Sequence, residues 1–163
     1  MIYDMTKFES DCNTFFSVLQ LKNRYLFNFF RVQYLAGLRA EEIINTNYAT
    51  LNEDLSINWF TCKGNDARYF APDYFDPAFY VFLQQDNNYF NKQSLKTIIY
   101  QFNLFYPTPH IFHKSKLIRT HIFRHMKMKK LYEYGYSIHQ IGIVFGELEP
   151  RNVENYVFSE LIY

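Results

Sequence analysis

The chain has 163 residues, of which 48% are hydrophobic and 20% charged, a balance typical of one soluble globular domain with a sizeable core. Its apolar runs end well before the roughly 18 residues of a membrane helix, and its N-terminus lacks the cationic and then apolar order of a signal peptide. These features argue against membrane and secreted proteins, and we expect cytoplasmic localisation.

The two cysteines, Cys12 and Cys62, lie far apart in the sequence and belong to no Cys-x-x-Cys or Cys/His pattern. Neither a disulfide scaffold nor a structural zinc site is therefore indicated. We expect reduced thiols and no bound metal.

The first part of the chain predicts three helices. Thr6 and Glu9 match a capping box, and the apolar residues that follow recur at helical spacing. The predicted helices span about 7–20, 23–36 and 39–44.

The stretch 48–72 is the only region that predicts β-structure. Turn-forming residues separate short runs that include Trp59 and Phe60, and Pro72 ends the last run, so we expect two or three short antiparallel strands. The fold class is mainly α with one small antiparallel sheet, an α+β fold. Five further helices are predicted near 77–85, 93–105, 120–134, 138–145 and 150–161. Three glycines are expected to end helices: Gly37, Gly135 and Gly146.

Charge is segregated along a chain whose net charge is only +1. The segment 87–132 has no Asp or Glu and holds nine of the seventeen Lys and Arg residues, so it carries +9 while the rest carries 8 − 16 = −8. A local basic surface follows, for which phosphate is the natural partner. The alternative is an ordinary solvated cationic helix face. DNA contacts are predicted for Lys114, Lys116, Arg119 and Lys127.

A helix start at Thr120 would place His121 and Arg124 in the first helical turn. Free backbone N–H groups favour an anion there, and the planar guanidinium of arginine suits a phosphate. The pattern His-x-x-Arg is too short to be specific by itself.

Four segments in order make the pattern specific. The segments are AGLRAEEI (36–43), FTCKGNDARYFAP (60–72), HIFRH (121–125) and FGELEPRNVENY (145–156). In content and spacing they resemble the motifs of the tyrosine recombinases, the phage-integrase family, and the resemblance runs from about residue 22 to the C-terminus. It implies the fold of that family's catalytic domain and these catalytic residues: Arg39, Lys63, His121, Arg124, Glu147 and Tyr156.

The resemblance also implies a mechanism. Tyr156 attacks a DNA phosphate to form a 3′-phosphotyrosine, Arg39 and Arg124 neutralise the charge on the phosphate, and Lys63 protonates the leaving 5′-oxygen. His121 assists proton transfer, and neither a metal nor another cofactor is required. Double-stranded DNA and other recombinase protomers are the expected partners.

Glu147 departs from the family, which has His or Trp at that position. An ionised carboxylate there would repel a phosphate, so we expect Glu147 to be protonated, to turn away towards a basic residue, or to weaken the site. A second reading follows, in which the chain is a weakened or inactive DNA-binding relative with an accessory role. A third is an unrelated helical domain that binds peptides through aromatic side chains.

Taken singly, the motif residues have ordinary explanations. Arg39 could pair with Glu41 or Glu42, Lys63 could be a solvated hairpin tip, and Tyr156 could be a core or surface tyrosine. For His125 we expect packing or a supporting hydrogen bond.

The organisation expected from the resemblance is one catalytic domain over 1–163, without the family's N-terminal core-binding domain. The tail that follows Tyr156 could pack on a neighbouring protomer.

Overall fold

A computed structural model describes residues 1–61, 67–85 and 89–163. The helices of these parts are α1 (Met5–Lys22), α2 (Arg24–Ala36), α3 (Ala40–Ile44), α4 (Pro77–Gln85), α5 (Leu95–Phe105), α6 (Ile122–Glu133), α7 (Ile138–Phe145) and α8 (Pro150–Val157). Short 3-10 turns are η1 (Thr46–Tyr48), η2 (Tyr89–Asn91) and η3 (Arg119–His121). The strands are β1 (Ala49–Leu51), β2 (Ile57–Trp59), β3 (Arg68–Phe70), β4 (Phe112–His113) and β5 (Lys116–Leu117). The prediction of a mainly α fold with a small antiparallel sheet is confirmed.

Helix α1 begins earlier than the sequence predicted. Its N-cap is Asp4, whose side chain accepts the N–H of Lys7 at 2.9 Å, so the predicted capping box at Thr6 is wrong. Asn23 then ends α1 and caps α2 by accepting the N–H of Leu26. One polar residue therefore turns the chain between two long helices.

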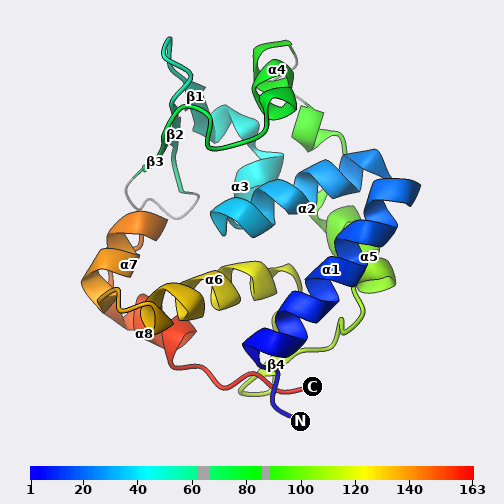
Figure 1. Cartoon of the computed structure of the whole chain (residues 1–163), viewed down its shortest axis with the longest axis vertical. Helices are drawn as coiled ribbons and strands as arrows, with labels where there is room; N and C mark the ends of the chain where they lie inside the picture. Colours follow the sequence, from blue (N-terminus) through cyan, green and yellow to red (C-terminus); the bar gives the residue numbers. More distant parts are fainter. Residues whose placement is uncertain (62–66, 86–88) are drawn as a thin grey trace.

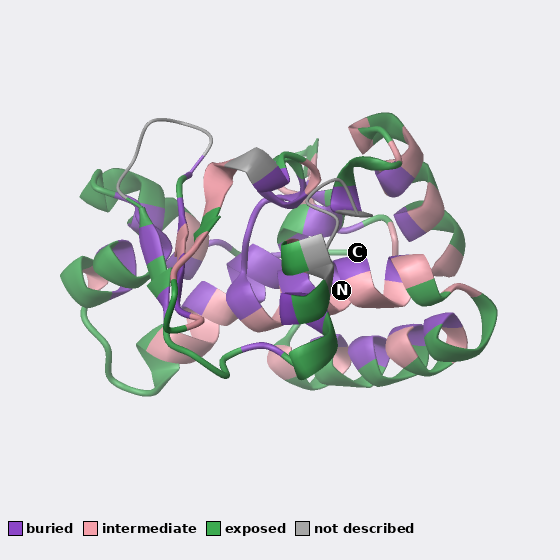
Figure 2. Ribbon diagram, turned by 90° about the horizontal axis from the view of Figure 1, so that it is seen from above, coloured by how far each residue is buried: buried purple, intermediate pink, exposed green. Residues whose placement is uncertain are grey.

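The main core lies where α1, α2, α5 and α6 meet. Its centre is a set of buried phenylalanines whose rings lie 5.2 to 6.3 Å apart: Phe15, Phe30, Phe102 and Phe123. Each contributes about 1.5–3 kcal/mol by burial. Figure 2 shows buried residues on the faces of the helices that meet in the interior. This packing fixes the position of the first turn of α6, which contains Arg124 of the His-x-x-Arg motif.

The three-stranded sheet has the order β1-β2-β3, with antiparallel pairs. Trp59 anchors it, because its indole N–H donates to the Glu42 carbonyl at 3.0 Å and its ring stacks on Phe79. Arg68 lies directly across from Trp59 on β3. The sheet and α4 lie at one end of the molecule, and α6, α7 and α8 lie towards the other (Figure 1).

A second hairpin, β4-β5, was not predicted, so the expectation of a single β region is wrong. Its turn residues Lys114 and Ser115 have φ of 48° and 65°, which matches a type I′ turn that usually takes Asn or Gly. Because Lys and Ser are not typical of this turn, the hairpin could not be predicted from the sequence.

The C-terminal tail also differs from expectation. Helix α8 ends at Val157 rather than near residue 161, and Ile162 pairs with Phe112 of β4 and with Ile2. Leu161 is buried in the core of its own chain. The described tail therefore packs on its own chain, which places the two termini side by side (Figure 1).

A smaller second core joins α6, α7 and α8. Its buried members are Met128, Ile141, Phe145, Val153 and Val157. Ser137 caps α7, and Gly146 ends it as predicted. This packing places the turn after α7 and the Tyr156 side of α8 against α6.

Candidate functional site

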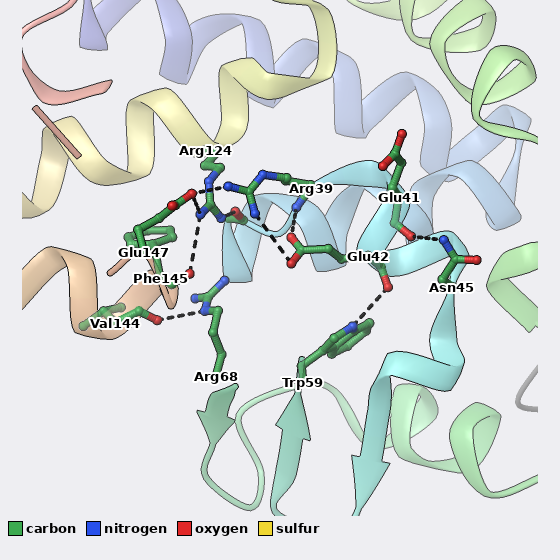
Figure 3. Close-up of polar contacts among 11 residues, drawn as sticks. Arg39, Glu41, Glu42, Asn45, Trp59, Arg68, Arg124, Val144, Phe145 and Glu147 are labelled. Atoms are coloured by element: carbon green, nitrogen blue, oxygen red, sulfur yellow. Dashed lines mark hydrogen bonds and ion pairs between the residues drawn. The ribbon is translucent and has the colours of Figure 1, made fainter. Parts of the chain in front are cut away.

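Two buried arginines from distant parts of the chain meet at one carboxylate. Arg39 precedes α3 and Arg124 lies in the first turn of α6; they are 7% and 0% exposed. Arg124 Nη2 donates to Glu147 Oε1 at 2.9 Å, and Arg39 Nη2 donates to the same oxygen. Glu147 therefore bridges the two guanidinium groups (Figure 3).

Arg39 is held by the start of α3. The Glu42 carboxylate accepts the backbone N–H of Arg39 at 2.7 Å and lies 3.8 Å from its Nη1. The simple pairing with Glu42 is thus present, and Arg39 also reaches Glu147. A carboxylate in the first helical turn is favoured by the helix dipole, so Glu42 stabilises α3 and orients Arg39 together.

Arg124 is held mainly by backbone carbonyls. Its Nη1 donates to the Gly37 carbonyl at 2.9 Å, and its Nη2 lies 3.5 Å from the Phe145 carbonyl. The approach needs glycine at 37, where φ is +66° and a Cβ would lie 2.5 Å from the Phe145 ring. Two helix ends therefore fix one guanidinium. Thr120 is not the cap that the sequence predicted, because it lies in η3 and α6 starts at Ile122.

The turn after α7 places Glu147 between the arginines. Its backbone N–H donates to the Gly142 carbonyl at 2.8 Å, and a Cβ at position 142 would lie 2.6 Å from the Glu147 carbonyl oxygen. Burial raises the pKa of the Glu147 carboxyl, but the charges of Arg124 and Arg39 outweigh burial and hold that pKa below its usual value. Glu147 is therefore ionised at neutral pH. Of the three expectations, a protonated Glu147 is wrong, and the carboxylate pairs with the site arginines instead of turning away from them.

Tyr156 lies beside this cluster on α8 and is half-buried. Its ring centroid is 5.7 Å from the Arg124 guanidinium carbon and 4.6 Å from the His125 ring. His125 Nδ1 is 3.3 Å from the Ser159 hydroxyl, which donates to the Tyr156 carbonyl. This fits the packing and supporting role expected for His125. Burial, aided by the charges of His121 and His113, lowers the pKa of His125 to about 3, so the ring is neutral.

A cleft of about 940 Å³ opens at the cluster. Four predicted catalytic residues line it: Arg39, His121, Glu147 and Tyr156. Three of the predicted DNA-contact residues do so as well: Lys114, Lys116 and Arg119. All three are exposed, and two of them come from the β4-β5 hairpin and its turn. The cleft therefore lies next to both the Arg39–Arg124 pair and a basic rim.

Three predicted site residues are not among those that line the cleft. Arg124 is fully buried and pairs with Glu147, which does line it. Lys127 does not line it; the side chain is half-buried on α6, and burial and the charge of Arg68 lower its pKa. Lys63 lies outside the described residues. Sequence reasoning did not identify His113, which also lines the cleft, or Arg68, which lies beside the arginine pair. Arg68 stands in the lysine-containing motif, and its alternation with outward-facing Tyr69 could have indicated an inward position.

No protein-family model and no curated protein matches the sequence. Among solved structures, XerA recombinase matches over 91% of this chain with a TM-score of 0.61 and 18% sequence identity. The chain has the recombinase fold. It spans 58% of the length of the XerA recombinase chain. The fold predicted from the four motifs is therefore confirmed.

No helix among the described residues is long and apolar enough to cross a membrane.

Proposed function

We propose that the protein is a tyrosine-recombinase relative whose catalytic domain cleaves and rejoins DNA strands through Tyr156. The observation that carries this proposal is the meeting of Arg39 and Arg124 beside Tyr156, at the edge of a cleft with a basic rim. These residues come from three separate motifs of the sequence, and a shared cleft is what their proposed joint role requires.

In the proposed reaction, the Tyr156 oxygen bonds to the phosphorus of a DNA phosphodiester as the bond to the 5′-oxygen breaks. The products are a 3′-phosphotyrosine and a free 5′-hydroxyl, and the reverse attack rejoins the strand. Charge that gathers on the phosphate oxygens is neutralised by the two guanidinium groups, which are preorganised by Gly37 and Glu42.

Proton transfers are assigned to two further residues. His121 is exposed in the cleft and would assist at the phosphate or the phenol, and Lys63 would protonate the departing 5′-oxygen. His125 is a poor candidate for either transfer because its pKa of about 3 leaves it neutral and weakly basic. Its place against the Tyr156 ring suits positioning instead.

Double-stranded DNA is the proposed partner, bound on the basic rim by Lys114, Lys116 and Arg119. Such contacts neutralise backbone phosphates and release counterions, so binding would weaken steeply with salt. Assembly with further protomers on DNA and a cytoplasmic location belong to the same proposal.

Glu147 favours a second candidate function, a DNA-binding relative with little or no cleavage activity. Its ionised carboxylate occupies the position between the guanidinium groups that a phosphate would need. A phosphodiester must displace it or share the arginines with it. Either event costs binding free energy, which would slow cleavage without removing DNA binding.

Trapping a covalent intermediate tests the two functions. The protein is incubated with a pool of nicked duplexes of random sequence, whose short 5′-hydroxyl fragment diffuses away after cleavage and prevents rejoining. An adduct on denaturing gels that is lost in Tyr156→Phe and kept in Tyr134→Phe supports the recombinase proposal. Tyr134 is a matched control because its phenol is exposed and lies outside the cleft. Salt-dependent DNA binding without an adduct supports the accessory function.

A further inference from the structure

A third arginine lies beside the Arg39–Arg124 pair. Arg68 of β3 is only 4% exposed, and its guanidinium carbon lies 4.8 Å from the Phe70 ring centroid and 4.7 Å from that of Phe145. Its Nε donates to the Val144 carbonyl at 2.8 Å. The side chain thus reaches from the sheet to the end of α7 (Figure 3).

Arg68 makes no direct ion pair with a described carboxylate, and the charge of Glu42 acts on it only from a distance. Its buried Nη1 has no hydrogen-bond partner among the described residues. Burial, and then the charge of Arg124, lower its pKa to about 9, so the group is still a cation at neutral pH. Burying a charge without an ion-pair partner costs free energy of folding. An uncharged side chain could have linked the sheet to α7 without that cost.

Arg68 contacts the same turn that holds the anion site. The Phe145 ring is shared, because the Arg124 guanidinium lies 5.2 Å from its centroid. Arg124 also binds the Phe145 carbonyl, and Glu147 follows two residues later. Arg68 therefore contacts the same turn as Arg124, but it makes no ion pair with Glu147.

The charges of this buried group do not cancel. Among the described residues of the group, Arg39, Arg68 and Arg124 contribute +3, and Glu42 and Glu147 contribute −2, which leaves +1. Each additional cation near the pair raises the local potential and favours a bound anion. A singly charged phosphodiester would bring the sum to zero even with Glu147 still in the site.

We propose that Arg68 is a supporting cation of the anion site, which strengthens phosphate binding at Arg39 and Arg124 without contacting the phosphate. The inference rests on the proposed function and extends it to a residue of the sheet. It accounts for an arginine, rather than an apolar residue, between two phenylalanine rings.

Binding of inorganic phosphate tests this without requiring catalysis. Titration calorimetry is carried out in the Glu147→Gln protein, where the internal carboxylate no longer competes, with and without a change at Arg68. Adding Arg68→Met should weaken phosphate binding at least tenfold. Adding Arg68→Lys, which keeps the charge, should weaken phosphate binding less than threefold at pH 6.5. Arg31→Met is the control and should leave the phosphate affinity unchanged, although Arg31 also lies over two aromatic rings, Phe16 and Tyr34.

The outcomes separate the inference from the proposed function. Equal losses in the Met and Lys variants would assign Arg68 to packing only, and unchanged affinity in both, or no phosphate binding by Glu147→Gln, would overturn the inference. Phosphate binding that depends on Arg68 in a protein that forms no DNA adduct would keep the inference and reject the cleavage activity. Fluorescence of Trp59, the single tryptophan and the cross-strand neighbour of Arg68, reports whether each variant is folded.

Discussion

Replacing Glu147 with glutamine should have opposite effects on folding and on anion binding. Glutamine keeps the volume and one acceptor oxygen, but it removes the charge that bridges Arg39 and Arg124. The folded protein then holds two buried guanidinium groups close together without the carboxylate between them. Stability should fall, and the affinity for phosphate should rise.

The structure sets the size of the effect. Removing one partner of a buried ion pair costs about 3–5 kcal/mol. The lower end applies, about 3 kcal/mol, because Glu42 still lies 3.8 Å from Arg39 and backbone carbonyls still bind Arg124. For a chain of this length the melting temperature should fall by roughly 6–12 °C.

The loss should depend on pH in a defined direction. The pKa of Glu147 is lowered in the folded protein, so its stabilising effect is complete above its unfolded pKa of 4.5 and is lost as pH falls through the lower folded value. The difference between wild type and Glu147→Gln should therefore be full at pH 7 and shrink below pH 4.5.

Urea unfolding followed by Trp59 fluorescence measures these quantities, with and without inorganic phosphate. Phosphate should stabilise Glu147→Gln more than wild type, because a ligand stabilises the state to which it binds. Glu53→Gln, at an exposed turn, is the control and should stay within about 0.5 kcal/mol of wild type. If Glu147→Gln is as stable as wild type and phosphate affects both equally, the carboxylate does not occupy the anion site.

Further outcomes can be checked with the same assays. Glu147→His should raise the yield of covalent adduct on nicked DNA, and an unchanged or lower yield would contradict the competition described above. Gly142→Ala should lower stability by about 2 kcal/mol in thermal unfolding, because its Cβ would meet the Glu147 carbonyl at 2.6 Å; a more stable variant would show that the turn relaxes freely. His125→Gln should flatten the stability profile between pH 6.5 and 3, where wild type loses stability as the unfolded chain takes up a proton that the buried ring resists; parallel profiles would refute this. Leu161→Ala should cost about 3 kcal/mol if the tail packs in cis in solution, and a neutral result would show that it does not.

Helix boundaries were predictable where local chemistry decides them. Gly37 and Gly146 end α2 and α7 in the left-handed conformation, which glycine adopts without strain. Boundaries failed where a competing local cap was stronger, as at Asp4, or where the chain adopted an unusual conformation, as in the Lys114–Ser115 turn. Neither of these turn residues carries a signal that distinguishes it from an ordinary surface residue.

The sequence by itself determined the class of fold and the candidates for the site, since helical periodicity, turn residues and four ordered motifs are local properties of the chain. Only the tertiary structure decided that Glu147 is ionised and bridges Arg39 and Arg124, and that Arg68 contacts the same turn. The physical reason is that charge state and pairing depend on distances between groups from α3, α6, α7 and β3. These distances are set by the packing of the whole molecule.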